Sequence, residues 1–238
     1  MLFRSVIVIA DRLNPMIKQI FSHYDDYQGG IIALGAIAYT IQLYCDFSGT
    51  MDAVMGVAQS FGVTMPENFQ RPFFSKSISE FWKRWHITLG TWFKDYIFYP
   101  VTMSKPMKNL TSSARKKLGN HFGPLLAGSI ALFCVWFCNG LWHGSAWGYI
   151  FFGMYHFVLI LSGNIIAPAV TAFNKKLHIN SECFAYKVFQ IVRTCILVVI
   201  GEMFFRAERL TTGLSMFGKM VTDFSFSSLN YELMKKLK

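Results

Sequence analysis

The sequence predicts an all-α, polytopic membrane protein that also contains one amphipathic helical segment, either interfacial or re-entrant. Three observations lead to this fold class. Only 15% of the 238 residues are charged, whereas a typical soluble domain is about 25% charged. Hydrophobic residues make up 53% and aromatic residues 17% of the chain, which excludes intrinsic disorder. Finally, charged residues are missing from stretches that reach the roughly 20 apolar residues a helix needs to cross a bilayer.

The first uncharged stretch covers residues 27–45 and is long enough for one span. Its glycines and alanines are the small residues that let membrane helices approach closely. We expect this span to end at residues 46–49, where Asp46 introduces a charge. Ser48 or Thr50 would then cap a short following helix, with Asp52 in its first turn.

A longer uncharged stretch covers residues 118–174. It has room for two spans, and we expect its apolar arms at residues 122–137 and 147–167, joined by a turn near residues 139–145. A weaker candidate covers residues 184–205 and is interrupted by charged residues that include Arg193 and Glu202. A buried helix of a large soluble enzyme would explain one such segment, but it does not explain the whole set.

The positive net charge of +10 is concentrated in residues 65–117. From Arg71 to Lys117 there are ten Lys or Arg residues and two acids. By the positive-inside rule this segment faces the cytoplasm, where cations meet anionic lipid headgroups. A nucleic-acid partner is not predicted, because the cations are scattered among membrane-length segments and no nucleic-acid-binding motif accompanies them.

An amphipathic segment lies within this basic region. Ser77 precedes Glu80 by three residues, which is the pattern of a helix capping box. We expect the following helix to place three aromatic residues, one leucine and one histidine on a single face: Trp82, Trp85, His86, Leu89 and Phe93. Aromatic residues mixed with cations are typical of the headgroup level of a bilayer. A lone histidine on such a face is more often structural than functional, and both roles stay open for His86.

A second histidine lies in Asn139-Gly-Leu-Trp-His143-Gly-Ser-Ala-Trp147. A titratable side chain at membrane depth usually marks a functional site, and histidine suits general-base chemistry near neutral pH. Trp142 and Trp147 could line a pocket, and Asn139 could orient the ring of His143 if helix continues there. The alternative is a solvated histidine at the tip of a polar hairpin. No metal site is predicted, since the histidines lack metal-ligand spacing.

Several motifs follow one another in an order that resembles a known family: Tyr44-Cys-Asp-Phe-Ser-Gly49, Pro66-Glu-Asn-Phe69, Arg71-Pro72, Glu80-Phe-Trp-Lys-Arg-Trp-His-Ile-Thr-Leu89, Trp92-Phe-Lys-Asp-Tyr96 and Gly140-Leu-Trp-His-Gly144. Together they resemble the membrane-bound O-acyltransferase (MBOAT) family, in the bacterial branch of alginate O-acetyltransferases and the teichoic-acid D-alanyl transferase. Segments Ile9-Ala-Asp-Arg-Leu13 and Phe204-Phe-Arg-Ala207 also resemble this branch.

This resemblance implies a helical fold with a funnel and a tunnel through the membrane. It implies that His143 is the catalytic histidine and that His86 is a second, supporting one. Members of the branch are longer and carry further membrane helices ahead of the Ile9-to-Leu13 match. We therefore expect residues 1–238 to form a single MBOAT-like domain that lacks the N-terminal helices, and whether this short chain is active alone stays open.

The predicted function is transfer of an acyl group, most readily acetyl, from a cytoplasmic thioester to a hydroxyl of a cell-envelope polysaccharide or a relay protein. The donor would be acetyl-CoA or an acyl-carrier protein thioester, with no bound cofactor. Besides lipid, the expected partners are the polysaccharide acceptor or an extracytoplasmic acyltransferase. The expected location is the cell membrane, with several spans. The substrate-binding residues would be Trp142, Asn139, Trp147, Trp85 and Arg84. The alternative function is a non-catalytic membrane scaffold or transporter subunit.

Overall fold

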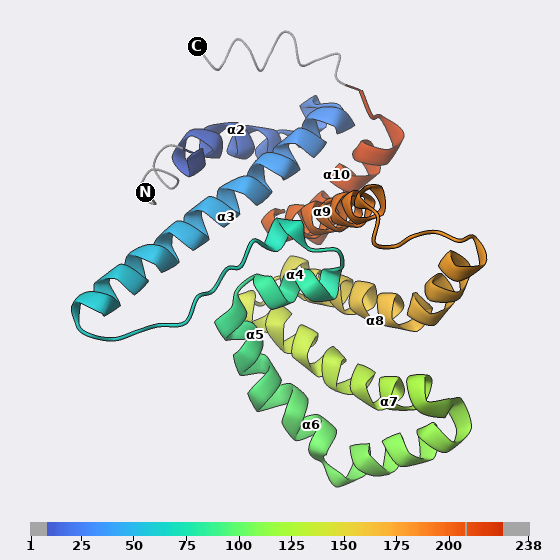
Figure 1. The fold of residues 1–238 in the computed structure, drawn as a ribbon. Coiled ribbons are helices and arrows are strands. Elements are labelled where there is room, and N and C mark those ends of the chain that lie inside the picture. The colour runs from blue at the N-terminus through green and yellow to red at the C-terminus, as the bar shows by residue number, and fades with distance from the viewer. Residues whose placement is uncertain (1–8, 208, 226–238) are drawn as a thin grey trace. The chain divides into compact units, whose positions relative to one another are not determined.

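A computed structural model describes residues 9–207 and 209–225, and these residues form helices and no named strand (Figure 1). Four helices are long and apolar enough to cross a membrane: α3 (Gly29–Ser60), α7 (Lys105–His143), α8 (Trp147–Lys176) and α9 (Phe184–Arg206). They contain the four predicted spans, so the prediction of an all-α polytopic fold is confirmed. The predicted domain covers residues 1–238, and its two ends, residues 1–8 and 226–238, lie outside the described residues.

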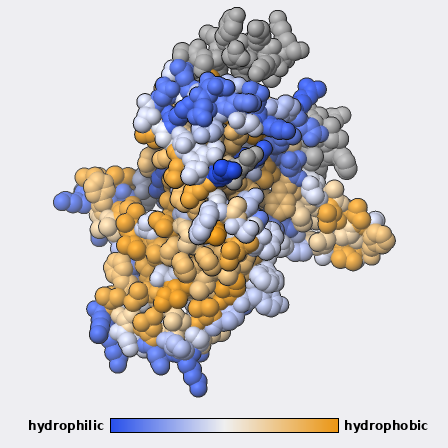
Figure 2. All heavy atoms as spheres, turned by 180° about the vertical axis from the view of Figure 1, so that it is seen from behind, coloured by the Kyte–Doolittle hydropathy of each residue, from blue (hydrophilic) through white to orange (hydrophobic). Residues whose placement is uncertain are grey.

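The exposed side chains of these helices are largely hydrophobic, as expected for contact with lipid. On α7, after its break at Gly119, they recur at helical spacing along one stripe: Phe122, Leu126, Ile130, Phe133, Phe137 and Leu141. Figure 2 shows hydrophobic side chains gathered over much of the visible surface. Apolar surface of this extent would be unfavourable in water and is stable in a bilayer.

The chain divides into two compact units. The first comprises residues up to 66 and from 198 on. It contains α2 (Asp11–Ser22), the 3-10 turn η2 (Tyr24–Asp26), α3, the end of α9, and α10 (Leu210–Thr222). Helices α2 and α10 both pack on α3. A Cβ atom on Gly35 would lie 2.9 Å from Cγ2 of Ile20, so the small residues of α3 provide close approach, as the sequence indicated.

One prediction about this unit is wrong. Helix α3 does not end at residues 46–49 but continues to Ser60, and no short capped helix follows Asp46. The Ser48 hydroxyl donates a hydrogen bond to the Tyr44 carbonyl oxygen (2.6 Å), one turn earlier in the same helix. A serine that bonds back to its own helix does not cap a new one. A single Gly49 costs only about 1 kcal/mol in a helix interior, which the rest of the helix tolerates.

The second unit comprises residues 67–197. Its elements are η3 (Pro72–Phe74), α4 (Ile78–Arg84), α5 (Ile87–Phe93), the π-turn η4 (Lys94–Phe98), α6 (Tyr99–Met103), α7, α8 and the first part of α9. Helix α7 contains a break at Gly119, which has φ 78° and ψ −176°. The C-terminal part of α7 and the start of α8 form a helical hairpin joined by residues 144–146 (Figure 1).

The start of α4 confirms the predicted cap. The Ser77 hydroxyl accepts a hydrogen bond from the Glu80 backbone N–H (3.1 Å). The Glu80 carboxylate accepts one in return from the backbone N–H of Lys76 (2.8 Å), one residue before the cap. The first bond satisfies a backbone donor that the first turn of a helix leaves unpaired, and the second ties the residue before the cap to the same turn.

The end of α4 contradicts the predicted aromatic face. The helix stops at Arg84, Trp85 adopts an extended backbone, and His86 lies in the left-handed region at φ 48° and ψ 53° before α5 begins. Trp82 and Leu89 therefore belong to different helices. The physical reason is tertiary: Trp85 forms an isolated antiparallel bridge with Phe69, and this pairing replaces the helical hydrogen bonds that would have carried α4 onward.

Candidate active site

The hairpin of α7 and α8 positions His143 at the last residue of α7. A Cβ atom on Gly140 would lie 2.7 Å from the Tyr149 carbonyl oxygen, and one on Gly153 would collide with the carbonyl oxygen of Trp136. Two glycines on facing helices thus allow direct backbone contact. As a result the His143 ring lies 6.1 Å from the ring of Phe152, nearly perpendicular to it.

Gly144 ends α7 directly after His143. Its φ of 152° and ψ of 171° are accessible essentially to glycine alone. A Cβ atom there would also lie 2.8 Å from the ring of Tyr149. The helix therefore persists through His143, as required for Asn139 to share a face with it, and the chain turns sharply at the next residue.

The second histidine is positioned by Asn68. The Asn68 side chain is 3% exposed, and its Oδ1 accepts hydrogen bonds from the Thr88 backbone N–H (3.2 Å) and the Thr88 hydroxyl (2.6 Å). The Asn68 carbonyl oxygen accepts another from the Ile87 N–H (3.1 Å). These three bonds cap the start of α5 from a distant part of the chain. They hold His86 in its left-handed conformation, which is uncommon for a residue with a Cβ atom.

The same asparagine determines the tautomer of His86. Nδ1 of His86 lies 3.3 Å from Asn68 Oδ1, and that atom is an oxygen because it accepts a backbone N–H. Nδ1 therefore carries the proton and donates, which leaves the lone pair on Nε2. Burial lowers the pKa of His86 from 6.5 to about 4, so the imidazole is neutral near pH 7.

The two histidines meet across Trp142. The Trp142 ring lies 4.6 Å from the ring of His143 and 6.0 Å from the ring of His86, and it is steeply inclined to both. The two imidazoles are also close enough to interact electrostatically. The structure therefore brings together three of the predicted site residues, His86, Trp142 and His143, from two separate segments of the second unit.

The other four predicted residues lie as follows. Asn139 is 8% exposed, and its Oδ1 has no hydrogen-bond partner among the described residues. Trp85 is 5% exposed and stacks on Phe81. Arg84 forms an ion pair with Glu80 (2.6 Å), and Trp147, at the start of α8, is 72% exposed. A substrate-binding role for these four residues stays a prediction.

Sequence reasoning assigned no role to two residues that the structure places next to this site. Asn68 lies in the Pro66-Glu-Asn-Phe69 motif, but nothing local indicated that it would reach His86. His156 is fully buried in α8; its Nδ1 donates to the Phe152 carbonyl oxygen (3.0 Å), while its Nε2 has no partner among the described residues. A titratable side chain within a membrane span was the available signal for His156.

His156 belongs to an aromatic cluster that joins three helices. Its ring lies 4.9 Å from that of Trp82 on α4 and stacks on Trp136 of α7 at 5.4 Å. Nε1 of Trp82 is also buried, with no partner in the described part of the chain. A donor and an acceptor that both lack partners therefore belong to neighbouring rings. The cluster links the segment that carries His86 to the hairpin that carries His143.

Comparison with known proteins gives the same assignment as the motifs. Residues 6–115 match the model of the MBOAT, membrane-bound O-acyltransferase family. That range contains His86 and Asn68, whereas His143 lies beyond it. The chain is also 35% identical over 230 residues to the probable alginate O-acetylase AlgI of Pseudomonas syringae pv. tomato. The aligned region covers 96% of this chain and 39% of the relative.

Two further relatives are named for different activities. The teichoic acid D-alanyltransferase of Bacillus subtilis is 38% identical over 130 residues, covering 53% of this chain and 29% of the relative. The peptidoglycan O-acetyltransferase of Helicobacter pylori is 28% identical over 186 residues, covering 78% and 31%. The chain spans about two fifths of the length of the alginate O-acetylases that it matches. Together with four long apolar helices, these matches identify a multi-pass membrane protein. The chain therefore belongs to the membrane-bound O-acyltransferase family.

Proposed function

We propose that this chain carries the two-histidine centre of an O-acyltransferase, which moves an acyl group, most readily acetyl, from a cytoplasmic thioester to a hydroxyl of a cell-envelope polymer. The observation that carries the proposal is the meeting of His86 and His143 across Trp142 at the end of a membrane helix. Family membership and the alginate and peptidoglycan acetylases among the relatives support the same reaction class.

In this reaction His143 acts as the general base. It accepts the proton of the acceptor hydroxyl while the hydroxyl oxygen attacks the thioester carbonyl carbon. The carbon–sulfur bond then breaks, and the thiolate leaves with the proton that His143 had held. The acyl group passes directly to oxygen, so no acyl-histidine intermediate is required. Trp142, which is 55% exposed, and Phe152 lie beside His143, and a bound substrate that covers them would exclude water and protect the thioester from hydrolysis.

His86 has a supporting role. Its Nδ1–H is directed to Asn68, so Nε2 is the atom that carries the lone pair. A neutral imidazole beside His143 leaves His143 free to take up a proton, whereas a charged neighbour would repel that proton. Burial keeps His86 neutral. Trp142 fixes the spacing of the two rings. Asn139, one turn before His143, has an Oδ1 with no partner among the described residues, and this oxygen is placed to accept a hydrogen bond from a substrate.

The donor is expected to approach the basic segment 65–117. That segment carries ten Lys or Arg residues between Arg71 and Lys117, which favours the phosphates of acetyl-CoA or of a carrier-bound phosphopantetheine. The acceptor is a polysaccharide hydroxyl or a relay serine on an extracytoplasmic acyltransferase. Both substrates meet at His143, where holding them in line supplies much of the rate enhancement.

The decisive experiment measures label transfer in membranes that contain this chain. One arm supplies acetyl-CoA labelled in its acetyl group, and a second supplies a carrier protein charged with labelled D-alanine. Alginate and peptidoglycan are the acceptor probes, and polymer-bound label is the measurement. We expect transfer from acetyl-CoA, and we expect His143→Ala to abolish it while the amount of membrane-inserted protein stays unchanged.

The matched control is His178→Ala, which removes an exposed histidine in the loop after α8. This variant is expected to retain full transfer. Persistent transfer by His143→Ala would refute the mechanism. Absence of transfer by the unmodified chain with either donor would favour the alternative, a non-catalytic membrane scaffold or transporter subunit.

A further inference from the structure

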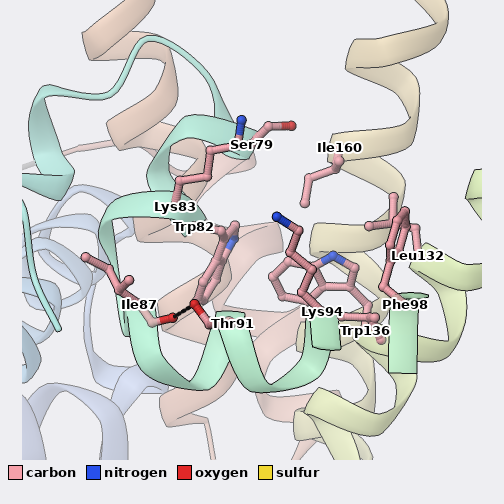
Figure 3. A pocket seen from close by; sticks show the side chains of 12 residues that line it. Ser79, Trp82, Lys83, Ile87, Thr91, Lys94, Phe98, Leu132, Trp136 and Ile160 are labelled. Atoms are coloured by element: carbon pink, nitrogen blue, oxygen red, sulfur yellow. Dashed lines mark hydrogen bonds between the residues drawn. The ribbon is translucent and has the colours of Figure 1, made fainter. Parts of the chain in front are cut away.

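A pocket of about 430 Å³ lies between the basic segment and the membrane hairpin of the second unit (Figure 3). It is lined by residues of α4, α5 and η4 on one side and of α7 and α8 on the other. They are Ser79, Trp82, Lys83, Ile87, Gly90, Thr91, Lys94, Phe98, Leu132, Val135, Trp136 and Ile160. The volume falls in the range of small-molecule sites, about 300 to 1,000 Å³. Neither His86 nor His143 lines it.

The polar groups of the pocket are cationic. Lys83 and Lys94 both line it, and Figure 3 shows Lys83 beside Trp82 and Lys94 beside Trp136. No lining residue is acidic, and neither lysine forms an ion pair within the described part of the chain. The nearby acid on α4, Glu80, is already paired with Arg84. Lys94 Nζ lies 5.3 Å from the centroid of the Tyr99 ring, but neither lysine is paired with a carboxylate among the described residues.

The apolar part of the pocket belongs to membrane helices. Leu132, Val135 and Trp136 come from α7 and Ile160 from α8, and both helices are long and apolar enough to span a bilayer. The cations come from the amphipathic segment, whose mixture of tryptophan and lysine is typical of the headgroup level. A complementary ligand is therefore apolar at membrane depth and anionic at the interface.

We propose that this pocket binds one anionic phospholipid from the surrounding leaflet. An acyl chain lies along Trp136, Leu132 and Ile160, and the phosphate interacts with Lys83 and Lys94. Juxtamembrane lysines attract anionic lipid in this way. The assignment adds a site to the protein that is separate from the two histidines.

A lipid at this position would contact α4 and α7, the helices that lead to His86 and His143. Trp82 of α4 lines the pocket and packs against Trp136 of α7, with ring centroids 4.9 Å apart. The same α4 leads directly to His86, and the same α7 ends at His143. An occupant in contact with both tryptophans therefore holds the two histidine-bearing segments together.

The experiment titrates the purified chain in detergent with phosphatidylglycerol or with phosphatidylcholine of the same acyl chains, and measures bound lipid by native mass spectrometry. We expect a single retained phosphatidylglycerol and at least tenfold weaker retention of phosphatidylcholine. Each lysine replacement, Lys83→Ala or Lys94→Ala, is expected to weaken phosphatidylglycerol binding about fivefold. The matched controls are Lys105→Ala and Lys108→Ala, which remove lysines of the same basic segment outside the pocket.

Two further arms make the result decisive. Val135→Trp fills the pocket without changing charge and is expected to abolish the retained lipid, while circular dichroism checks that helix content is unchanged. Acetyl-CoA is added as a competitor that also carries phosphates. Equal retention of the two lipids, or equal loss in the control lysine variants, would overturn the proposal. Displacement of phosphatidylglycerol by acetyl-CoA would overturn it as well, because the pocket would then belong to the acyl donor. All arms measure binding, so the outcome does not depend on acyl transfer.

Discussion

Replacing Gly140 or Gly153 by alanine tests the backbone contact that positions His143. Each change adds one methyl group on the face where α7 meets α8. On Gly140 the new Cβ atom would lie 2.7 Å from the Tyr149 carbonyl oxygen and 3.0 Å from the Cα atom of Ile150. Both are backbone atoms, so no flexible side chain can move aside, and the helices themselves must separate.

The magnitude follows from the distances. A close carbon–oxygen contact between helices is about 3.3 to 3.6 Å, so the backbones must separate by roughly 0.6 Å or more at Gly140. Gaps of that size forfeit a quarter to a half of the dispersion energy of the contacts they open, and overpacking of this kind costs about 1 to 3 kcal/mol. The collision is more severe at Gly153, where the new atom meets the Trp136 carbonyl oxygen. Its cost should therefore lie at the upper end.

The chain supplies a matched control on each helix. Gly128 on α7 and Gly163 on α8 have nothing within 4 Å of an added Cβ atom. Alanine is favoured over glycine in a helix interior by about 1 kcal/mol, and all four variants share that gain. The difference between Gly140→Ala and Gly128→Ala therefore isolates the packing cost and should be about 1 to 3 kcal/mol.

The assay is unfolding by sodium dodecyl sulfate in mixed micelles, followed by circular dichroism, with the free energy extrapolated to zero dodecyl sulfate. We expect Gly140→Ala and Gly153→Ala to unfold at a detergent fraction equal to or lower than that of the unmodified chain. Both should unfold at a fraction well below that of their controls. If all four variants unfold at the same detergent fraction, then α7 and α8 are not in backbone contact and the account of how His143 is positioned fails.

Three other predictions concern the second histidine and the buried cluster. The folded pKa of His86, about 4, lies below its ordinary value of 6.5, so the unfolded chain gains the proton first. Stability is then constant above pH 6.5 and falls as the pH is lowered from 6.5 to 4. Thermal unfolding across this range should show a shallower decline in His86→Gln. Asn68→Ala removes the acceptor of both Thr88 hydrogen bonds and should destabilise the chain by about 1 to 3 kcal/mol; a smaller loss in a denaturation titration would argue against its capping role. Trp82 and His156 carry, on neighbouring rings, a donor and an acceptor that have no partner within residues 9–207 and 209–225. A double-mutant cycle with Trp82→Phe and His156→Phe should give a coupling of about 0.5 to 3 kcal/mol, and additive effects would show that the two rings act independently.

The amino-acid sequence was sufficient to predict the four spans and the hairpin. Residues 118–174 carry no charge, which indicates that they lie in the membrane and not in water. Their length fits two membrane helices and a turn. The cap at Ser77 was equally local, because its donor and acceptor are three residues apart. Such features depend on composition or on near neighbours in the chain, so no knowledge of distant contacts is needed to infer them.

The break between α4 and α5 and the meeting of the two histidines were decided by tertiary structure. The local pattern around His86 is that of a continuous amphipathic helix, and the competing hydrogen bonds come from Asn68, 18 residues earlier. Likewise, the ring of Trp142 at the end of α7 meets the ring of His86, which lies 56 residues earlier in the chain. Hydrogen bonds and close contacts between distant residues have no periodicity in the sequence. Such contacts override the local preference for helix where they stabilise the chain more than one further turn of helix would.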